Sequence, residues 1–157
     1  MDAAIIIFYS KDNNTRTAAN ILEKRIGART VELKEIKKGN FIQAVFKRGS
    51  RLVGSPWNEL KPYKRIYLML PIWASNSVPA MNTFLGKADF AGKEVIIVTL
   101  QQFEDLKNSG KVHNYIRQMV KKSHGIVLEC HALLGGKMGH FAGEAFIENQ
   151  VLKLIPE

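Results

Sequence analysis

The sequence has a single cysteine, Cys130, and this scarcity removes two kinds of architecture. One cysteine cannot form a disulfide framework within the chain, and no cysteine pair is present to begin a zinc or iron–sulfur site. The four histidines, His113, His124, His131 and His140, are scattered without the spacing of metal ligands. Cys130 and His131 are neighbours, but adjacent strand residues point to opposite faces, so we do not expect a Cys–His catalytic pair.

Long apolar runs are also missing. Residues 1–9 lack the basic start, long apolar middle and small-residue exit of a signal peptide. No uninterrupted apolar run approaches the length that crosses a bilayer. The chain has 157 residues, of which 46% are hydrophobic and 24% charged, as is ordinary for a soluble globular protein. We therefore expect one domain over residues 1–157 in a cytoplasmic protein.

Acidic residues are few, and their shortage is local. The chain has 23 Lys and Arg against 14 Asp and Glu, which gives a net charge of +9. Residues 24–65 hold twelve of the basic and three of the acidic residues, so the whole excess lies in this segment. Such a segment fits an anionic partner, either an acidic protein, a membrane face or nucleic acid, and it equally fits a solvated basic face that keeps the protein in solution.

A buried strand followed by a polar loop and a helix forms the centre of the pattern. Ile66–Leu70 is an apolar run without alternation, which is typical of a strand covered on both faces. We expect the strand to end at Pro71, because proline cannot donate to a sheet ladder. Trp73 follows in the loop, and the next helix has Ser77 as its expected N-cap and Pro79 in its first turn. Trp73 is then a candidate wall for a flat ligand, although it also suits plain packing against that helix.

The remaining apolar runs alternate between strand and helix patterns without repeats or linkers. Residues 29–33 alternate in polarity, which predicts a half-exposed strand at the sheet margin. The expected strands are 3–9, 29–33, 66–70, 94–99 and 126–134, and the expected helices are 17–26, 41–46, 78–85, 112–122 and 144–154. This order predicts a doubly wound, three-layer α/β fold with a five-stranded parallel sheet of order 2-1-3-4-5.

The loop Ser10–Thr15 follows the first strand and opens a helix, so its amides are suited to hold a phosphate. It offers two hydroxyls and two asparagines, and Arg16 adds charge nearby. It lacks glycines at set spacing and is therefore neither a P-loop nor a dinucleotide fingerprint. An ordinary capped helix start is the alternative. The glycine-rich residues 135–143 likewise suit a second anion loop or a turn into the last helix.

In a sheet of this order the first and third strands are neighbours, and the strand order reverses between them. The loop Ser10–Thr15 should therefore lie beside residues 71–77. A phosphate cradle next to a tryptophan plane indicates a phosphorylated aromatic ligand.

At this point four stretches, residues 5–18, 60–74, 78–85 and 89–99, together resemble the flavodoxin-like proteins that bind flavin mononucleotide (FMN). The resemblance covers the first two-thirds of the chain and is most specific in the strand-Pro-x-Trp sequence followed by Pro-Ala and Phe-Leu. It implies FMN as the cofactor, with the phosphate held by one loop and the isoalloxazine ring by two others. The residues implied are Ser10, Lys11, Asp12, Asn13, Asn14 and Thr15 for the phosphate, and Pro71, Ile72, Trp73, Ala74, Ser75, Asn76, Thr99, Leu100, Gln101 and Phe103 for the ring and its surroundings.

Asp12 and Asn13 depart from the pattern, because they stand where the family commonly has Thr and Gly. We expect Asn13 to adopt the left-handed conformation in place of glycine. We expect Asp12 to turn away from the phosphate, towards Lys11, because a carboxylate repels a phosphate. After Thr99 the chain has Gln101, Gln102 and Phe103 in place of a glycine-containing segment, which suits hydrogen bonds to the flavin edge and stacking.

By this resemblance the protein transfers electrons or acts as a small NAD(P)H-linked flavin-dependent reductase, with no residue needed as a nucleophile. A pI near 9.7 implies that a redox partner protein is acidic, for example ferredoxin-like. The resemblance equally allows a small acceptor such as a quinone. A homodimer is possible by the sequence. The alternative is a cofactor-free binding module that uses residues 24–65 to engage an acidic protein or nucleic acid. Nucleic acid is not favoured, since no helix-turn-helix signature is present. Phe41–Leu52 is interpreted as a packed crossover helix, with contact to a membrane or partner as the alternative.

Overall fold

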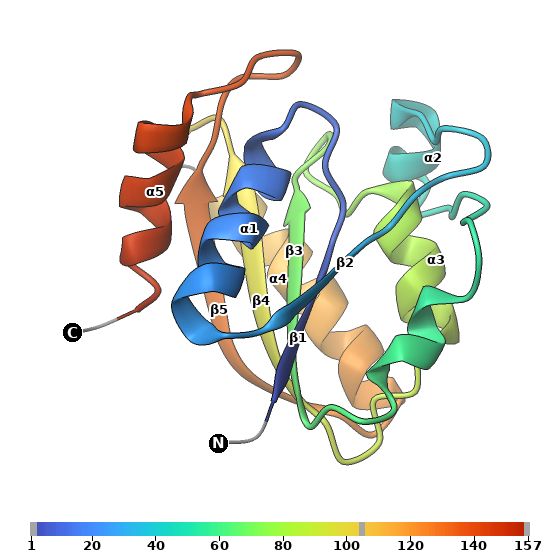
Figure 1. Ribbon diagram of the computed structural model, residues 1–157. Coiled ribbons are helices and arrows are strands. Elements are labelled where there is room, and N and C mark those ends of the chain that lie inside the picture. Colours follow the sequence, from blue (N-terminus) through green and yellow to red (C-terminus); the bar gives the residue numbers. More distant parts are fainter. Residues whose placement is uncertain (1–2, 104–105, 156–157) are drawn as a thin grey trace.

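The computed structural model describes residues 3–103 and 106–155 and contains a five-stranded sheet of order β2-β1-β3-β4-β5 (Figure 1). Every neighbouring pair of strands is parallel. The strands are β1 (Ala4–Phe8), β2 (Arg29–Glu32), β3 (Arg65–Pro71), β4 (Glu94–Gln101) and β5 (Ile126–Leu134). The strand order and the marginal position of β2 confirm the expectation from the sequence.

Helices cover both faces of the sheet, so the molecule has three layers. One face packs against α1 (Asn14–Ile26) and α5 (Glu144–Leu152), and the other packs against α3 (Pro79–Lys87) and α4 (Leu106–Lys122). A single turn, α2 (Phe41–Val45), and a 3₁₀ helix, η1 (Pro56–Leu60), lie on the connection between β2 and β3. No helix within the described ranges is long and apolar enough to cross a membrane.

The central strands are apolar at consecutive positions because both of their faces are buried. In β1, Ile5 and Ile7 pack with the α3–α4 layer, whereas Ile6 and Phe8 pack with the α1–α5 layer. All three isoleucines are fully buried. The loops that follow the carboxyl ends of the strands are therefore attached to a well-packed sheet.

Two helices begin earlier than the sequence pattern indicates. α1 begins at Asn14, so Asn14 and Thr15 belong to its first turn and not to a loop. α4 begins at Leu106, and its first turns include the buried Ser109, a small polar side chain that apolar periodicity does not detect. The expected cap of α3 is wrong, since Val78 occupies the N-cap position and the buried Ser77 hydroxyl makes no cap hydrogen bond. Pro79 stands in the first turn, as expected, while β3 runs one residue further than predicted and includes Pro71.

Candidate functional site

The loop after β1 lies at the carboxyl edge of the sheet, between β1 and β3. Asn13 has φ 71° and ψ −8°, the left-handed conformation that was expected of it, and it forms the N-cap position of α1. This conformation lets the chain turn sharply from the strand into the helix, so the first-turn amides of α1 face the edge of the sheet.

A hollow of about 100 Å³ opens beside this loop. The Ser10 hydroxyl borders it and is buried without a hydrogen-bond partner among the described residues, which is unusual for a polar atom. The hollow is lined by Ser10, Lys11, Asp12, Asn14, Thr15, Pro71, Ile72, Trp73, Leu100, Gln101, Gln102, Gly135, Gly136 and Met138. The structure thus brings together residues from the predicted phosphate loop and from both predicted ring loops.

A second hollow of about 180 Å³ continues the first one towards Phe103. The two share Ile72, Gln101 and Gln102, and the second also reaches Ser75. Together they form an elongated trough, which we call the switch-point trough, from the phosphate loop at one end to Phe103 at the other. Its shape suits a ligand with an anionic end and a flat end.

Four of the predicted site residues lie outside the lining of this trough. Asn13 is exposed and accepts a hydrogen bond from Arg16, and Ala74 is exposed at the tip of a turn. Asn76 donates to the Ala74 carbonyl from within that turn. Thr99 is fully buried under α4, where its Oγ1 lies 2.8 Å from Nε2 of His113.

Trp73 is only 4% exposed, because aromatic side chains cover it. Phe41 of α2 stacks on its ring, with centroids 5.3 Å apart and planes 25° apart, and Tyr9 meets its edge at 5.8 Å. The Lys11 ammonium lies 5.2 Å from the Trp73 ring centroid. The tryptophan thus borders the trough while its face is occupied by residues of the chain.

The loop that carries Trp73 is a tight two-residue turn. The amides and carbonyls of Trp73 and Asn76 exchange hydrogen bonds of 3.0 and 2.8 Å. Ala74 (φ 47°) and Ser75 (φ 58°) both have left-handed backbone, a conformation that is strained for non-glycine residues. The Ser75 hydroxyl donates to Asn108 of α4 at 2.8 Å, which fixes the turn beside the trough.

The glycine loop, residues 135–143 between β5 and α5, packs directly on the phosphate loop. The Asn14 side-chain amide donates to the His140 carbonyl and accepts from the Ala142 amide, each at 2.9 Å. The Asp12 carboxylate accepts from the Gly139 amide at 2.9 Å, so the expectation that it turns towards Lys11 is wrong. The sequence did not predict that the glycine loop lies at this site. The high glycine content of residues 135–143 was the only feature of the sequence that pointed to a role for this loop.

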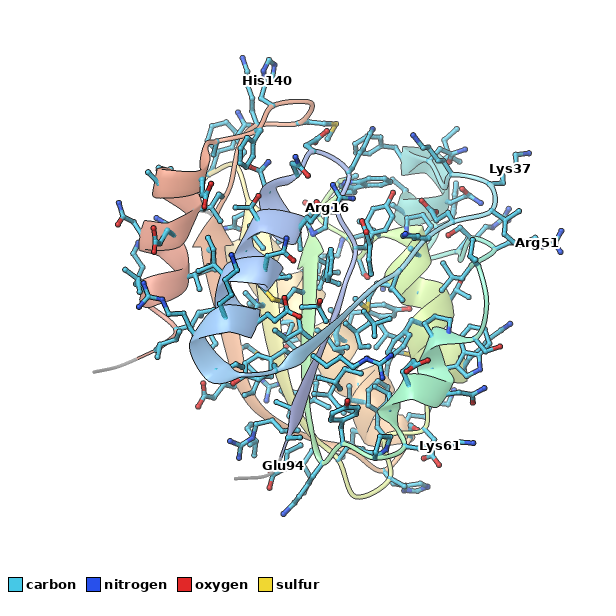
Figure 2. All side chains as sticks on the ribbon, viewed as in Figure 1. Arg16, Lys37, Arg51, Lys61, Glu94 and His140 are labelled. Atoms are coloured by element: carbon cyan, nitrogen blue, oxygen red, sulfur yellow. The ribbon has the colours of Figure 1, made fainter. Side chains whose placement is uncertain are left out.

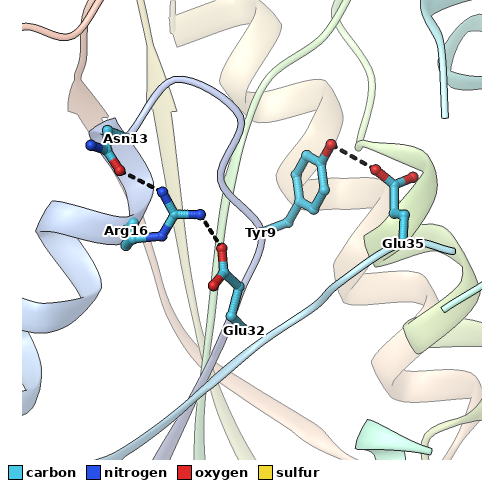
Figure 3. Close-up of polar contacts among 5 residues, drawn as sticks. All are labelled: Tyr9, Asn13, Arg16, Glu32 and Glu35. Atoms are coloured by element: carbon cyan, nitrogen blue, oxygen red, sulfur yellow. Dashed lines mark hydrogen bonds and ion pairs between the residues drawn. The ribbon is translucent and has the colours of Figure 1, made fainter. Parts of the chain in front are cut away.

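Figure 3 shows two sets of polar contacts beside β1, one around Arg16 and one between Tyr9 and Glu35. Arg16 donates to Asn13 and pairs with Glu32, so its charge is engaged by a carboxylate and does not point freely at the phosphate loop. The Tyr9 hydroxyl donates to Glu35 at 2.8 Å. Burial, together with this carboxylate, raises the pKa of Tyr9 well above its ordinary value. Tyr9 is therefore a neutral hydrogen-bond donor at physiological pH.

Among the residues that the structure describes, no group of three or more His, Cys, Asp and Glu side chains is arranged to hold a metal ion. Thr99 and His113 form a buried polar contact between β4 and α4, and Thr99 Oγ1 also lies 3.4 Å from the His131 carbonyl. Burial lowers the pKa of His113, and the nearby Arg117 and His131 lower it further.

No protein-family model and no curated protein matches the sequence. Solved structures do match it. A flavoprotein from Lactobacillus acidophilus in complex with FMN superposes with a TM-score of 0.66 at 14% identity, over 84% of this chain and 93% of that chain. Oxidised flavodoxin 2 from Bacillus cereus gives 0.64 at 18% identity, over 98% and 95% of the two chains.

The chain has the flavodoxin-like fold. The strand order and these superpositions agree, and the flavodoxin from Fusobacterium nucleatum bound to FMN adds a TM-score of 0.58 at 17% identity, over 98% and 97% of the chains. In a flavodoxin-like fold, ligands bind outside the carboxyl ends of the strands, where the strand order reverses between β1 and β3. The switch-point trough occupies that position in this chain.

Proposed function

We propose that this flavodoxin-like protein binds FMN in the switch-point trough and transfers electrons, either as a carrier or as an NAD(P)H-linked reductase of small acceptors such as quinones. The observation that carries the proposal is the trough itself, which joins the phosphate loop to the Trp73 and Gln101 loops at the strand-order switch. Two of the superposed structures are named as FMN complexes, which supports the same ligand here.

The phosphate end of the trough fits an anion. The unpartnered Ser10 hydroxyl supplies a donor, and the first-turn amides of α1 supply a positive dipole end. Asn13 provides the left-handed turn that glycine would otherwise provide. Asp12 is held by the Gly139 amide, so its carboxylate is engaged with the glycine loop. Lys11, which is exposed, adds a cation at the rim.

The ring end must open before it takes a flat ligand. The two hollows, at about 100 Å³ and about 180 Å³, together stay below the roughly 300–1,000 Å³ of ordinary ligand clefts. Phe41 covers the face of Trp73, and Met138 of the glycine loop lines the trough. We propose that FMN binding displaces Phe41 from Trp73, so that the ring lies between the 73–76 turn and Gln101–Phe103.

FMN would supply the redox chemistry, and the chain would bind it, orient it and exclude water. Ser10 and the α1 amides would hold the phosphate, and Gln101 with the turn backbone would face the ring edge. The fixed turn, tied to α4 through Ser75 and Asn108, would keep the ring environment rigid.

The test is the visible absorption spectrum of the purified protein, before and after incubation with excess FMN and desalting. A retained flavin spectrum, shifted from that of free FMN, is the expected result. Trp73→Phe should weaken retention or change the shift, whereas the matched variant Trp57→Phe, on the distant 3₁₀ helix, should not. A wild-type protein that stays colourless after FMN loading would overturn the proposal and leave the alternative of a cofactor-free module with a basic surface.

A further inference from the structure

A second surface lies at the outer corner of the molecule, where α2 and its flanking segments meet, next to the Trp73 side of the trough (Figure 1). We call it the corner surface and define it as residues 34–38, 42–48 and 51–53. Residues 34–36 and 51–53 run side by side: the Ile36 amide donates to the Arg51 carbonyl at 2.8 Å, and the Val53 amide donates to the Lys34 carbonyl at 2.7 Å. The two segments therefore form a short antiparallel ribbon.

Large apolar side chains project from the corner surface. In the ribbon, Leu52 faces inward and is buried, and alternation then directs Ile36 and Val53 outward. In α2, Ala44 is buried, while the residues on the other side of the turn are exposed. The exposed fractions are 61% for Ile36, 69% for Ile42, 51% for Val45, 66% for Phe46 and 56% for Val53.

Cations surround these apolar side chains, and Glu35 is the one acidic residue in the corner surface. Residues 36–58 contain Lys37, Lys38, Lys47, Arg48 and Arg51 and no Asp or Glu. Lys37, Lys38 and Arg51 border one hollow, and none of the three forms an ion pair within the described part of the chain. Figure 2 shows Lys37 and Arg51 extending away from the body of the protein.

The nearest carboxylate is already engaged elsewhere. Glu35 accepts hydrogen bonds from the Tyr9 hydroxyl at 2.8 Å and from the Gly39 amide at 2.7 Å, so it faces the interior side of the ribbon. It does not neutralise the corner surface by direct pairing with Lys37 or Arg51. The positive charge of this corner is therefore available to an outside partner.

The corner surface is held in shape by α3 and by its own cap. The Asn82 side chain donates to the Arg48 carbonyl at 2.9 Å, and Thr83 Oγ1 both donates to the Ser50 carbonyl and accepts from the Ser50 amide. Asn40 and Gln43 form a capping box that fixes the start of α2. These bonds fix the backbone that carries the exposed apolar side chains.

We propose that the corner surface docks on an anionic lipid bilayer, with Ile42, Val45 and Phe46 at the acyl boundary and the Lys and Arg side chains among the headgroups. Exposed apolar side chains mixed with cations are the pattern of interfacial membrane contact. Protein interfaces are depleted of lysine, whereas the corner surface carries Lys34, Lys37, Lys38 and Lys47. A nucleic acid backbone would leave the five apolar side chains without a partner.

Vesicle flotation with the full chain tests this proposal. We expect partition onto vesicles of phosphatidylcholine mixed with phosphatidylglycerol, little onto phosphatidylcholine alone, and weakening by salt. Lys37→Gln combined with Arg51→Gln should reduce partition roughly 25-fold, since each cation near the surface contributes about fivefold. Ile42→Ser combined with Phe46→Ser should reduce it by about tenfold or more.

Matched controls carry the same changes on other surfaces. Lys121→Gln with Lys122→Gln, at the exposed end of α4, and Ile126→Ser with Leu128→Ser, on the exposed part of β5, should leave partition unchanged. A second measurement does not depend on a variant losing binding. The introduced tryptophan of Ile42→Trp should be quenched by brominated lipid in anionic vesicles, and that of Leu128→Trp should not.

Three outcomes would overturn the proposal. The first is no partition at low salt. The second is partition that depends on Lys37 and Arg51 but not on Ile42 and Phe46, together with an unquenched Ile42→Trp, which would show charge attraction alone. The third is binding to polyglutamate or duplex DNA without binding to vesicles, which would assign the corner surface to an acidic protein or to nucleic acid.

Discussion

At the scale of single residues, Asn14 joins two loops that belong to opposite ends of the chain. Its side chain is both a donor, to the His140 carbonyl, and an acceptor, from the Ala142 amide. Only a side-chain amide offers both groups in one plane, so an aspartate or a hydrophobic residue at this position would lose at least one bond. The residue is 8% exposed, and its lost partners would be poorly hydrated.

Replacement of this amide should therefore destabilise the protein. Asn14→Ala is expected to lower the free energy of unfolding by about 1–3 kcal/mol, because it leaves part-buried backbone groups of the glycine loop without partners. Urea denaturation measures the effect. Asn20→Ala, on the exposed side of the same helix, is the control and should change stability by less than about 0.5 kcal/mol. We call the two hydrogen bonds of Asn14 to the glycine loop the Asn14 clamp. Equal effects of the two substitutions on stability would contradict this clamp.

Phe41 is the second residue with a testable role, because it occupies the face of Trp73. An aromatic stacking pair contributes about 0.5–1.5 kcal/mol, which a ligand that displaces Phe41 must overcome. Phe41→Ala should therefore tighten FMN binding by roughly three- to tenfold. Phe103→Ala should weaken it, since Phe103 lies at the ring end of the trough. Quenching of FMN fluorescence during titration measures both, and weaker binding by Phe41→Ala would argue against displacement.

The conformation of a single residue could be predicted from the sequence where its neighbours in the chain determine it. The left-handed backbone of Asn13 follows from the turn between a strand and a helix, and the sequence was sufficient to predict it. The orientation of Asp12 depends on Gly139, which lies 127 positions away. The stacking of Phe41 on Trp73 is also a long-range contact. No local pattern carries such contacts, so the sequence could not supply them.

At the scale of elements, α4 is connected to β4 through one buried polar pair. His113 is 9% exposed and Thr99 is fully buried, and their side chains share a hydrogen bond of 2.8 Å. Burial lowers the pKa of His113, with Arg117 and His131 acting in the same direction. The folded protein therefore favours the neutral imidazole at this contact between helix and sheet.

This preference predicts a pH dependence of stability. In the unfolded chain the imidazole titrates near about pH 6.5, so below that pH the unfolded state binds a proton that the folded state resists. Above this pH the unfolded chain does not bind the proton, so His113 does not destabilise the folded state. As the pH is lowered through this value, the free energy of unfolding should fall. His113→Gln should reduce the slope of stability between about pH 7 and pH 5. The exposed His140→Gln is the control, and an unchanged slope in His113→Gln would contradict the argument.

Element boundaries were predictable where apolar periodicity marks them. The strands β1 and β4 are marked by unbroken apolar runs, and the sequence located both. The start of α4 was missed because Ser109, which is buried near the start of the helix, is polar and small. The start of α1 was missed because Asn14 and Thr15 are typical turn residues that here lie in the first helical turn.

At the scale of the whole molecule, the sheet order places the trough, and it was predictable because alternating strands and helices leave few topologies open. The uneven distribution of charge was equally visible in the sequence. What the sequence could not provide was the closure of the trough, because Phe41 and the glycine loop reach it from segments that are remote in the chain.

A ligand that binds only the folded molecule raises its stability by mass action. FMN at about one hundred times its dissociation constant should add about 2.7 kcal/mol, which corresponds to a rise in Tm of roughly 5–10 °C for a chain of this size. Riboflavin has the same ring but no phosphate, so at equal concentration it should raise Tm much less. Differential scanning fluorimetry with free ligand as the blank distinguishes the cases. Equal shifts would contradict the phosphate cradle, and no shift with either ligand would contradict the proposed cofactor.

The Asn14 clamp has a consequence for the order of events during synthesis. The Asn14 amide leaves the ribosome 126 residues before its partner carbonyl at His140. At about 5–20 residues per second, the phosphate loop waits several seconds or longer for the segment that completes it. We therefore expect that a nascent chain does not retain FMN, the proposed ligand, until β5 and the glycine loop have emerged from the ribosome.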